Sequence, residues 1–124
     1  MKHIKLFENF GVYEALEGYL NCALWTGEFD DNDFDDIDSK SVDNARDDVD
    51  NFFEELRKHM LLDKLIKEMD LDSIGHDFWL TRNGNGVGFW DRDLGDLGDK
   101  VSKICELFGG KDIYKGDDEK IYIE

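Results

Sequence analysis

Hydrophobic residues recur at steps of one, three and four positions between residues 12 and 25, and this spacing predicts an amphipathic helix. The apolar face of that helix comprises Ala15, Leu16, Tyr19, Leu20, Ala23 and Leu24. Gly18 interrupts the stretch, and because glycine has no side chain it favours close packing of another element. Gly27 is the expected end of the helix. Residues 1–10 also carry apolar positions, which fit either a short helix or an edge strand.

Apolar residues at three- and four-residue spacing continue from residue 41 to about residue 69 and predict the longest helical segment. The stripe comprises Val42, Ala45, Val49, Phe52, Phe53, Leu56, Met60, Leu65, Ile66 and Met69. Ser39 or Ser41 is the expected N-cap, because a hydroxyl there can accept a hydrogen bond from a free backbone N–H. We expect the helix to break near residues 60–62.

The last third of the chain carries one further helical pattern and one hairpin pattern. Apolar residues recur between residues 93 and 108, with Asp93 as the expected N-cap and Gly109 with Gly110 as the end. Residues 112–123 then predict two short strands that flank a polar turn at residues 116–119.

The stretch 75–92, GHDFWLTRNGNGVGFWDR, holds two of the three tryptophans and predicts a second β-hairpin. Side chains alternate in a period of two from Phe78 to Arg82, which is typical of a strand. The Asn-Gly-Asn-Gly turn at residues 83–86 tolerates the positive φ angles that tight hairpins need. Residues 87–90 would form the return strand.

These elements predict an α+β fold formed by a single domain over residues 1–124. Two or three helices would pack on a small antiparallel sheet built from the two C-terminal hairpins. No apolar run approaches the ~20 residues of a membrane span, and no signal peptide is evident. Cys22 and Cys105 each fall in a helical pattern, so we expect buried, reduced thiols rather than a disulfide.

The residues of the predicted central hairpin allow two interpretations. In the first they form a recognition patch, because Trp and Arg are enriched in interface hot spots. That patch would comprise His76, Trp79, Arg82, Asn83, Asn85, Trp90 and Arg92. In the second, which we favour, the aromatics are buried on a sheet face and Arg–Asp pairs lie at its edge.

Catalytic and cofactor patterns are weak throughout the sequence. His76 stands next to Asp77, but proton transfer would also need a nucleophile and an oxyanion site, and neither is identifiable. Gly95 and Gly98 resemble a phosphate-binding helix start, yet the surrounding aspartates would repel a phosphate. We therefore predict a protein that is not an enzyme, with no catalytic residues and no cofactor.

The formal net charge of −16 arises from 31 acidic and 15 basic residues. Such a charge repels nucleic acid and anionic membranes, and it attracts basic surfaces. The expected partner is therefore a basic protein, above all one that itself binds nucleic acid. The alternative is a generically acidic protein with no such partner.

Carboxylates are densest in the loop at residues 28–38 and in the first half of the following helix. In the loop they are Asp30, Asp31, Asp33, Asp35 and Asp36. On one outer face of the helix they are Asp43, Asp47, Asp50 and Glu54, about 6 Å apart. That spacing is of the same order as phosphates along a nucleic-acid strand, so this acidic face could imitate a DNA backbone. An ordinary solvated face is the alternative that we favour.

The loop also resembles part of a calcium-binding loop. Asp31, Asp33 and Asp35 match the first three ligand positions. The match then fails, because Asp36 stands where glycine is needed and Val42 stands where the bidentate glutamate is needed. We predict no metal site.

Four segments together resemble a family of small acidic proteins encoded by tailed bacteriophages and prophages, for which no function is assigned. The segments are GHDFWLTRNGNGVGFWDR, LGDLGDK, DIYKGDDEKIYI and EALEGYLNCALW, and they cover about half of the chain. Family members often carry His where this sequence has Asn85, which argues against a metal or acid–base role for the turn. The resemblance implies phage origin and a cytoplasmic setting in a bacterial host.

The sequence therefore favours a phage-encoded acidic module that binds a basic host protein and modulates it, with nucleic-acid mimicry as one route. One alternative is a small enzyme or ligand-binding protein that uses the hairpin at residues 76–92. Another is a minor structural protein of the phage particle.

Overall fold

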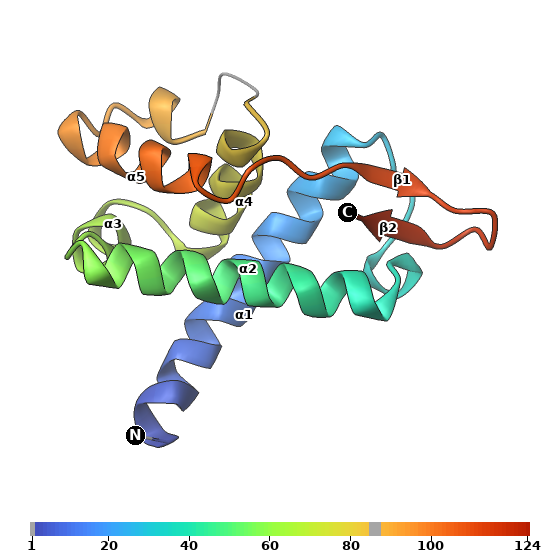
Figure 1. Ribbon diagram of the computed structural model, residues 1–124, viewed down its shortest axis with the longest axis horizontal. Coiled ribbons are helices and arrows are strands. Elements are labelled where there is room, and N and C mark those ends of the chain that lie inside the picture. The colour runs from blue at the N-terminus through green and yellow to red at the C-terminus, as the bar shows by residue number, and fades with distance from the viewer. Residues whose placement is uncertain (1, 85–87) are drawn as a thin grey trace.

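A computed structural model describes the backbone of residues 2–84 and 88–124, and the side chains from residue 11 onward except those of residues 85–87, 90 and 91. In that part of the chain, five α-helices are followed by one two-stranded antiparallel sheet (Figure 1). The helices are α1 (Lys2–Thr26), α2 (Ser39–Lys58), α3 (Leu62–Glu68), α4 (Leu71–Arg82) and α5 (Asp96–Glu106), and the strands are β1 (Ile113–Lys115) and β2 (Ile121–Ile123). Two short 3-10 turns, η1 (Phe34–Asp36) and η2 (Phe89–Arg92), lie in the connections.

Helices α1 and α4 cross in backbone contact, and glycine makes this possible on both sides. A Cβ atom added at Gly18 of α1 would lie 1.9 Å from the carbonyl oxygen of Asp72. A Cβ atom added at Gly75 of α4 would lie 1.7 Å from the carbonyl oxygen of Ala15. The prediction that Gly18 permits close packing is confirmed, because no larger residue fits at this crossing.

The long helical pattern of residues 41–69 is divided into two helices near the expected place. Helix α2 ends at Lys58, Met60 has a positive φ of 60°, and α3 begins at Leu62. The predicted serine caps are wrong: Asp38 is the N-cap of α2, and its carboxylate accepts a hydrogen bond from the backbone N–H of Ser41 at 3.2 Å. The ionised carboxylate is also favoured at the positive end of the helix dipole.

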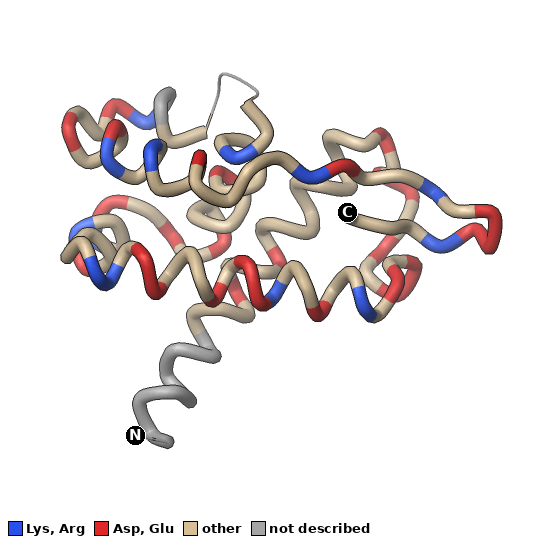
Figure 2. Tube along the Cα trace, in the orientation of Figure 1, with Lys and Arg blue, Asp and Glu red and all other residues tan. Residues whose placement is uncertain are grey.

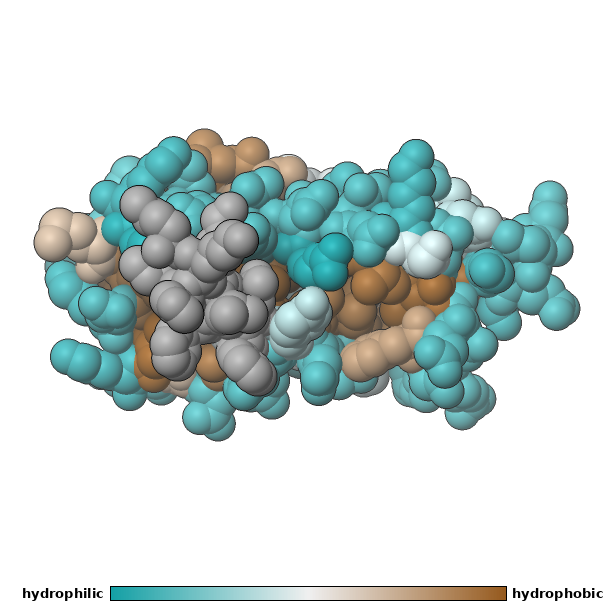
Figure 3. Space-filling model, turned by 90° about the horizontal axis from the view of Figure 1, so that it is seen from below, coloured by the Kyte–Doolittle hydropathy of each residue, from teal (hydrophilic) through white to brown (hydrophobic). Residues whose placement is uncertain are grey.

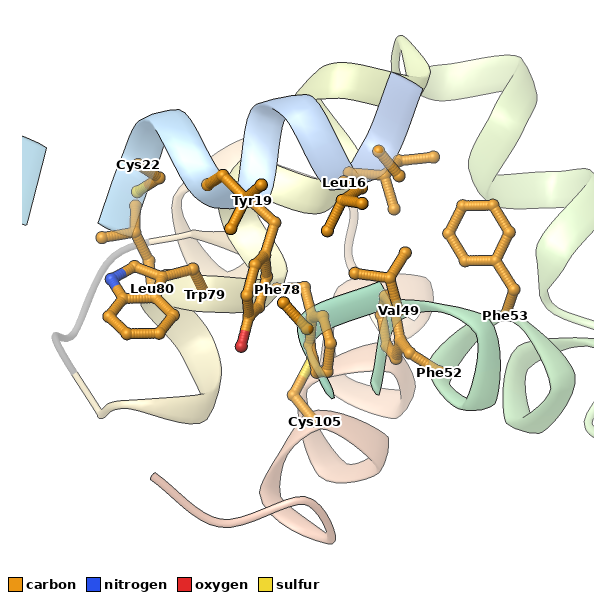
Figure 4. Packing of buried hydrophobic residues seen from close by; sticks show 14 of the residues in the cluster. Leu16, Tyr19, Cys22, Val49, Phe52, Phe53, Phe78, Trp79, Leu80 and Cys105 are labelled. Atoms are coloured by element: carbon orange, nitrogen blue, oxygen red, sulfur yellow. The ribbon is translucent and has the colours of Figure 1, made fainter. Parts of the chain in front are cut away.

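Aromatic rings from three helices meet at the centre of the core (Figure 4). Phe52 of α2 stacks on Phe78 of α4 with ring centroids 4.1 Å apart. Tyr19 of α1 packs against Phe78 at 5.5 Å and meets Trp79 edge-on at 5.3 Å. Phe108, just beyond α5, contacts Phe78 edge-on at 5.2 Å. This cluster joins the first half of the chain to the second.

The predicted hairpin at residues 75–92 is wrong, because residues 71–82 form helix α4 and residues 89–92 form η2. Residues 85–87, in the predicted turn and return strand, lie outside the described residues. Helix α4 is buried on nearly all sides, since Ile74, Gly75 and all six residues from Asp77 to Arg82 are buried. A helix enclosed in this way has no polar face, so the 3.6-residue period is hidden and the local β propensity of Phe-Trp-Leu-Thr is misleading.

The C-terminal hairpin, in contrast, is confirmed. Strands β1 and β2 pair antiparallel with Tyr114 opposite Tyr122, and the two rings stack at 5.6 Å. The other face of β2 is buried against the start of α2, where the N–H of Ile123 donates to the Ser41 hydroxyl at 3.1 Å. A parallel bridge from Ile37 to Ile121 attaches the 28–38 loop to the same strand.

In broad terms the α+β class is right, but the detailed architecture differs from the prediction. The described residues contain five α-helices rather than two or three, and they contain one hairpin rather than two. The helices pack mainly on one another. The N-terminal segment follows the helical alternative, since α1 begins at Lys2. The Asp93 cap is also wrong, because Gly95 precedes α5 and Asp93 has a left-handed backbone.

Both cysteines are buried free thiols in helices, as expected. Burial, assisted by the charge of Asp77, raises the pKa of Cys22 to about 12, and burial raises the pKa of Cys105 well above its ordinary value. At pH 8 both groups are therefore protonated, and the reactive thiolate is scarce. We expect no reaction of the folded protein with a thiol reagent such as dithionitrobenzoate, and two equivalents in denaturant. Rapid labelling under native conditions would show that these helices open.

Candidate functional site

The acidic loop at residues 28–38 is held in a defined shape by its own polar groups. The backbone N–H of Asp35 donates to the Asp33 carboxylate at 3.0 Å, and the N–H of Asp33 donates to the Asp36 carboxylate at 3.1 Å. The Asn32 amide donates to the same Asp36 carboxylate at 3.0 Å and lowers its pKa, with the Asp33 N–H as the second cause. These bonds form a capping box around η1 and fix the direction in which the carboxylates of Asp33 and Asp36 point.

Hydrophobic residues between the acids attach this loop to the core. Ile37 is buried, and Phe29 and Phe34 are partly buried against the same cluster. Four of the five selected loop acids are consequently exposed, and Asp36 is half-buried. The four are Asp30, Asp31, Asp33 and Asp35.

The four selected acids of α2 are all exposed on its outer face: Asp43, Asp47, Asp50 and Glu54. Two of them have basic neighbours on the same helix. Arg46 lies 3.6 Å from Asp43, and Arg57 lies 2.7 Å from Glu54. Residues 28–55 contain thirteen acids and two bases, Lys40 and Arg46, so this segment carries −11 of the net charge of −16. Figure 2 shows acidic positions along the loop and along α2, interrupted by these bases.

No group of three or more metal-ligating side chains lies together within the described residues. The three aspartates that match a calcium loop are all described, and their surroundings explain this. One Asp33 oxygen already accepts the N–H of Asp35, and the loop follows a 3-10 turn instead of wrapping around an ion.

A second polar cluster surrounds Asp77, a carboxylate that is only 2% exposed. Arg92 donates to both of its oxygens, at 2.7 and 3.2 Å, and the Nδ1 atom of His76 lies 3.2 Å from one of them. The hydrogen bond to Asp77 raises the pKa of Arg92, although partial burial opposes it. The ring of Trp25, at the end of α1, stacks on His76 with centroids 6.3 Å apart.

Chemically, this cluster is a buried ion pair with a histidine at its edge. The Cys22 thiol, whose pKa is raised by burial and by the charge of Asp77, has a pKa of about 12 and is therefore a poor nucleophile. An Arg–Asp pair of the expected kind is observed here, between α4 and η2 rather than at the edge of a sheet.

The structure separates the residues of the predicted recognition patch. Trp79 is buried and its indole N–H donates to the Thr26 hydroxyl at 2.8 Å. Asn83 bridges two segments, since its amide donates to the Trp79 carbonyl and its oxygen accepts the N–H of Lys111. Among the described patch residues, His76 and Arg92 meet around Asp77, and Asn83 contacts the backbone of Trp79. Asn85 and the side chain of Trp90 lie outside the described residues.

Arg82 is a buried structural residue rather than a surface contact. Its guanidinium makes four hydrogen bonds: to the Tyr19 hydroxyl, to the Asp48 carboxylate, and to the Phe108 and Gly109 carbonyls beyond α5. It also lies 5.2 Å from the centre of the Phe78 ring. The helical spacing Ile74, Phe78, Arg82 is the sequence signal that places this side chain toward the core.

Trp25 is an exposed aromatic residue that the sequence pattern does not single out. It is 60% exposed although it follows directly on the apolar stripe of α1. Its position one residue before the end of the helix is a weak signal of exposure, because residues near the end of a helix make fewer contacts with the core.

Replacing Arg92 with methionine is expected to lower the free energy of unfolding by about 2 kcal/mol, because the buried Asp77 carboxylate loses its bidentate partner. The loss is smaller than for a fully enclosed pair because Arg92 is 40% exposed. Urea titration measures it. Adding Asp77→Asn to Arg92→Met removes the unpaired charge, so the double variant should be more stable than the single one. Equal stability of wild type and Arg92→Met would contradict a structural role for the pair.

Comparison of this chain with protein-family models, with curated proteins and with solved structures finds no match. None of the described helices combines the length and the apolar character that crossing a bilayer requires.

Proposed function

We propose that this protein is a binding module whose acidic surface, residues 28–55, docks on a basic surface of a partner protein. The observation that carries the proposal is the charge of −11 on one continuous segment whose selected carboxylates are almost all exposed. Complementary charge of this size accelerates association and selects basic partners.

The order of the segment also supports a docking role. The capping box around η1 orients the carboxylates of Asp33 and Asp36, and the α2 carboxylates project from a helix whose other face is core. Because the backbone of this segment is already ordered, the entropy cost of binding is reduced. Seen from below, hydrophilic residues cover most of the described surface, and hydrophobic residues appear in patches between them (Figure 3).

The partner class that we propose is a protein that itself binds nucleic acid. Exposed carboxylates recur along α2 at steps of three and four residues, a spacing of about 6 Å that resembles the separation of backbone phosphates. Arg46 and Arg57 lower the charge density at Asp43 and Glu54. The proposed mimicry therefore centres on Asp47, Asp50 and the loop.

Affinity capture from bacterial lysate tests this function, and the motif resemblance to phage proteins motivates that source. The bait variant carries Asp43→Asn, Asp47→Asn, Asp50→Asn and Glu54→Gln. The matched control loses the same number of exposed acids elsewhere, through Asp63→Asn, Glu68→Gln, Asp99→Asn and Glu106→Gln. We expect wild type and control to retain one nucleic-acid-binding protein at low salt, and the bait variant to lose it.

The reading by mass spectrometry has two outcomes that would contradict the proposal. One is capture that is the same for all three baits. The other is capture that persists at about 1 M salt, where the Debye length is only ~3 Å and surface charges are screened.

A further inference from the structure

The turn between α2 and α3 and the outer side of α5 form an open hollow whose lining contains no acidic residue. Its volume is about 430 Å³, and a neighbouring hollow of about 280 Å³ shares Leu107 with it. The larger hollow is lined by His59, Leu61, Lys100, Lys103, Ile104 and Leu107. A volume of this size is typical of a small-molecule site.

The chemistry of the hollow is unlike that of the rest of the molecule. Leu61, Ile104 and Leu107 give it an apolar wall, and Leu107 is 74% exposed although it is a large aliphatic residue. Lys100 and Lys103 lie one helical turn apart on α5, and neither makes an ion pair with a described residue. Both lysines are exposed, so their ammonium groups are accessible to an anionic group that lies beside the apolar wall.

We propose that this hollow binds a small anionic amphiphile, such as a carboxylate attached to an apolar chain. The ammonium groups of Lys100 and Lys103 hold the carboxylate, and the chain lies along Leu61, Ile104 and Leu107. The neighbouring hollow is lined by Glu54 and Glu55 as well as by Leu107 and Phe108, so it does not favour an anionic or apolar ligand.

The net charge favours a small ligand over a large acidic one. An acidic protein or an anionic membrane surface would be repelled by the whole field of a −16 molecule. A small monovalent ligand carries a single charge, so this repulsion is smaller for it, and Lys100 and Lys103 belong to the lining of the hollow itself. The inference does not depend on the proposed docking role of residues 28–55, since either site can be lost without the other.

The test is titration of the protein with sodium decanoate below its micelle concentration, followed by calorimetry and by amide chemical shifts. We expect saturable binding, with shifts concentrated at residues 59–61 and 100–108. Lys100→Gln with Lys103→Gln should weaken it at least tenfold, because each charge-assisted contact is lost. Leu107→Asn should weaken it as well, and folding should survive because this side chain is exposed. Lys115→Gln with Lys120→Gln, two exposed lysines of the hairpin region, is the matched control and should bind as wild type does.

Decyltrimethylammonium has a chain of similar length and the opposite charge, and it should not shift the amides of residues 59–61 and 100–108. Equal shifts at these residues with both probes, an unchanged affinity for decanoate in the lysine variant, or no saturable binding of decanoate would overturn the proposal. So would exclusive binding of an acidic amphipathic peptide at the same residues, because it would make the hollow a protein-docking groove.

Discussion

Gly75→Ala is expected to lower the free energy of unfolding by about 3 kcal/mol or more, at the upper end of the cost of overpacking a core. The added Cβ atom would lie 1.7 Å from the carbonyl oxygen of Ala15, so α1 and α4 would have to move apart. Separation of these helices would also disturb Tyr19, which packs on Phe78 and Trp79. Urea denaturation followed by tryptophan fluorescence measures the change.

Two further glycine variants make this prediction specific. Gly18→Ala should destabilise comparably, because its Cβ atom would lie 1.9 Å from the Asp72 carbonyl oxygen on the opposite side of the crossing. Gly11→Ala, in the same helix, meets only side-chain atoms at 3.6 Å or more, so it should be neutral or stabilising by up to about 1 kcal/mol. A Gly75→Ala protein as stable as the wild type would contradict the close crossing.

Arg82→Met should lower the free energy of unfolding by about 3–5 kcal/mol, the usual cost of breaking a buried charged network. Methionine retains much of the apolar stem but leaves four acceptor contacts unmade, with Tyr19, Asp48 and the two carbonyls beyond α5. Arg82→Lys should recover only part of the loss, because an ammonium group cannot reproduce the planar fork. Thermal and urea unfolding measure both variants.

Arg46→Met is the matched control for Arg82→Met. Arg46 is 44% exposed and lies 3.6 Å from Asp43, so its removal should change stability by less than about 1 kcal/mol. If Arg46→Met and Arg82→Met destabilised the protein equally, the buried network would not join the helices as described.

The elements that are predictable from the sequence are those with one solvent-exposed face and one buried face. Helices α1, α2 and α5 show the expected apolar stripes, and the C-terminal hairpin follows from its turn residues. Helix α4 is not predictable in this way because it is buried on nearly all sides, so that even Gly75 and Asp77 are buried. Its helical state is imposed by packing against α1, and local propensity cannot report on a contact made 50 or more residues away.

The residues of the candidate site likewise fall into those that the local sequence pattern predicts and those that depend on distant contacts. Exposure of Asp43, Asp47, Asp50 and Glu54 follows from helical period alone, and all four are exposed. Arg82 and Trp79 are held by partners distant in sequence, such as Tyr19 and Thr26. Residue type alone therefore left both a recognition surface and a buried setting open for them. The lysines beside Leu107 carry no motif, and only the fold brings them next to His59 and Leu61.

The most direct measurement of the acidic-surface proposal is the Kd for the purified captured partner as a function of salt. We predict that affinity falls steeply as salt rises, and that the variant neutralised at residues 43, 47, 50 and 54 binds at least tenfold more weakly at about 0.1 M salt, with a shallower salt dependence. The control variant neutralised at residues 63, 68, 99 and 106 should stay close to wild type. Identical affinities and identical salt slopes for all three proteins would contradict the proposal.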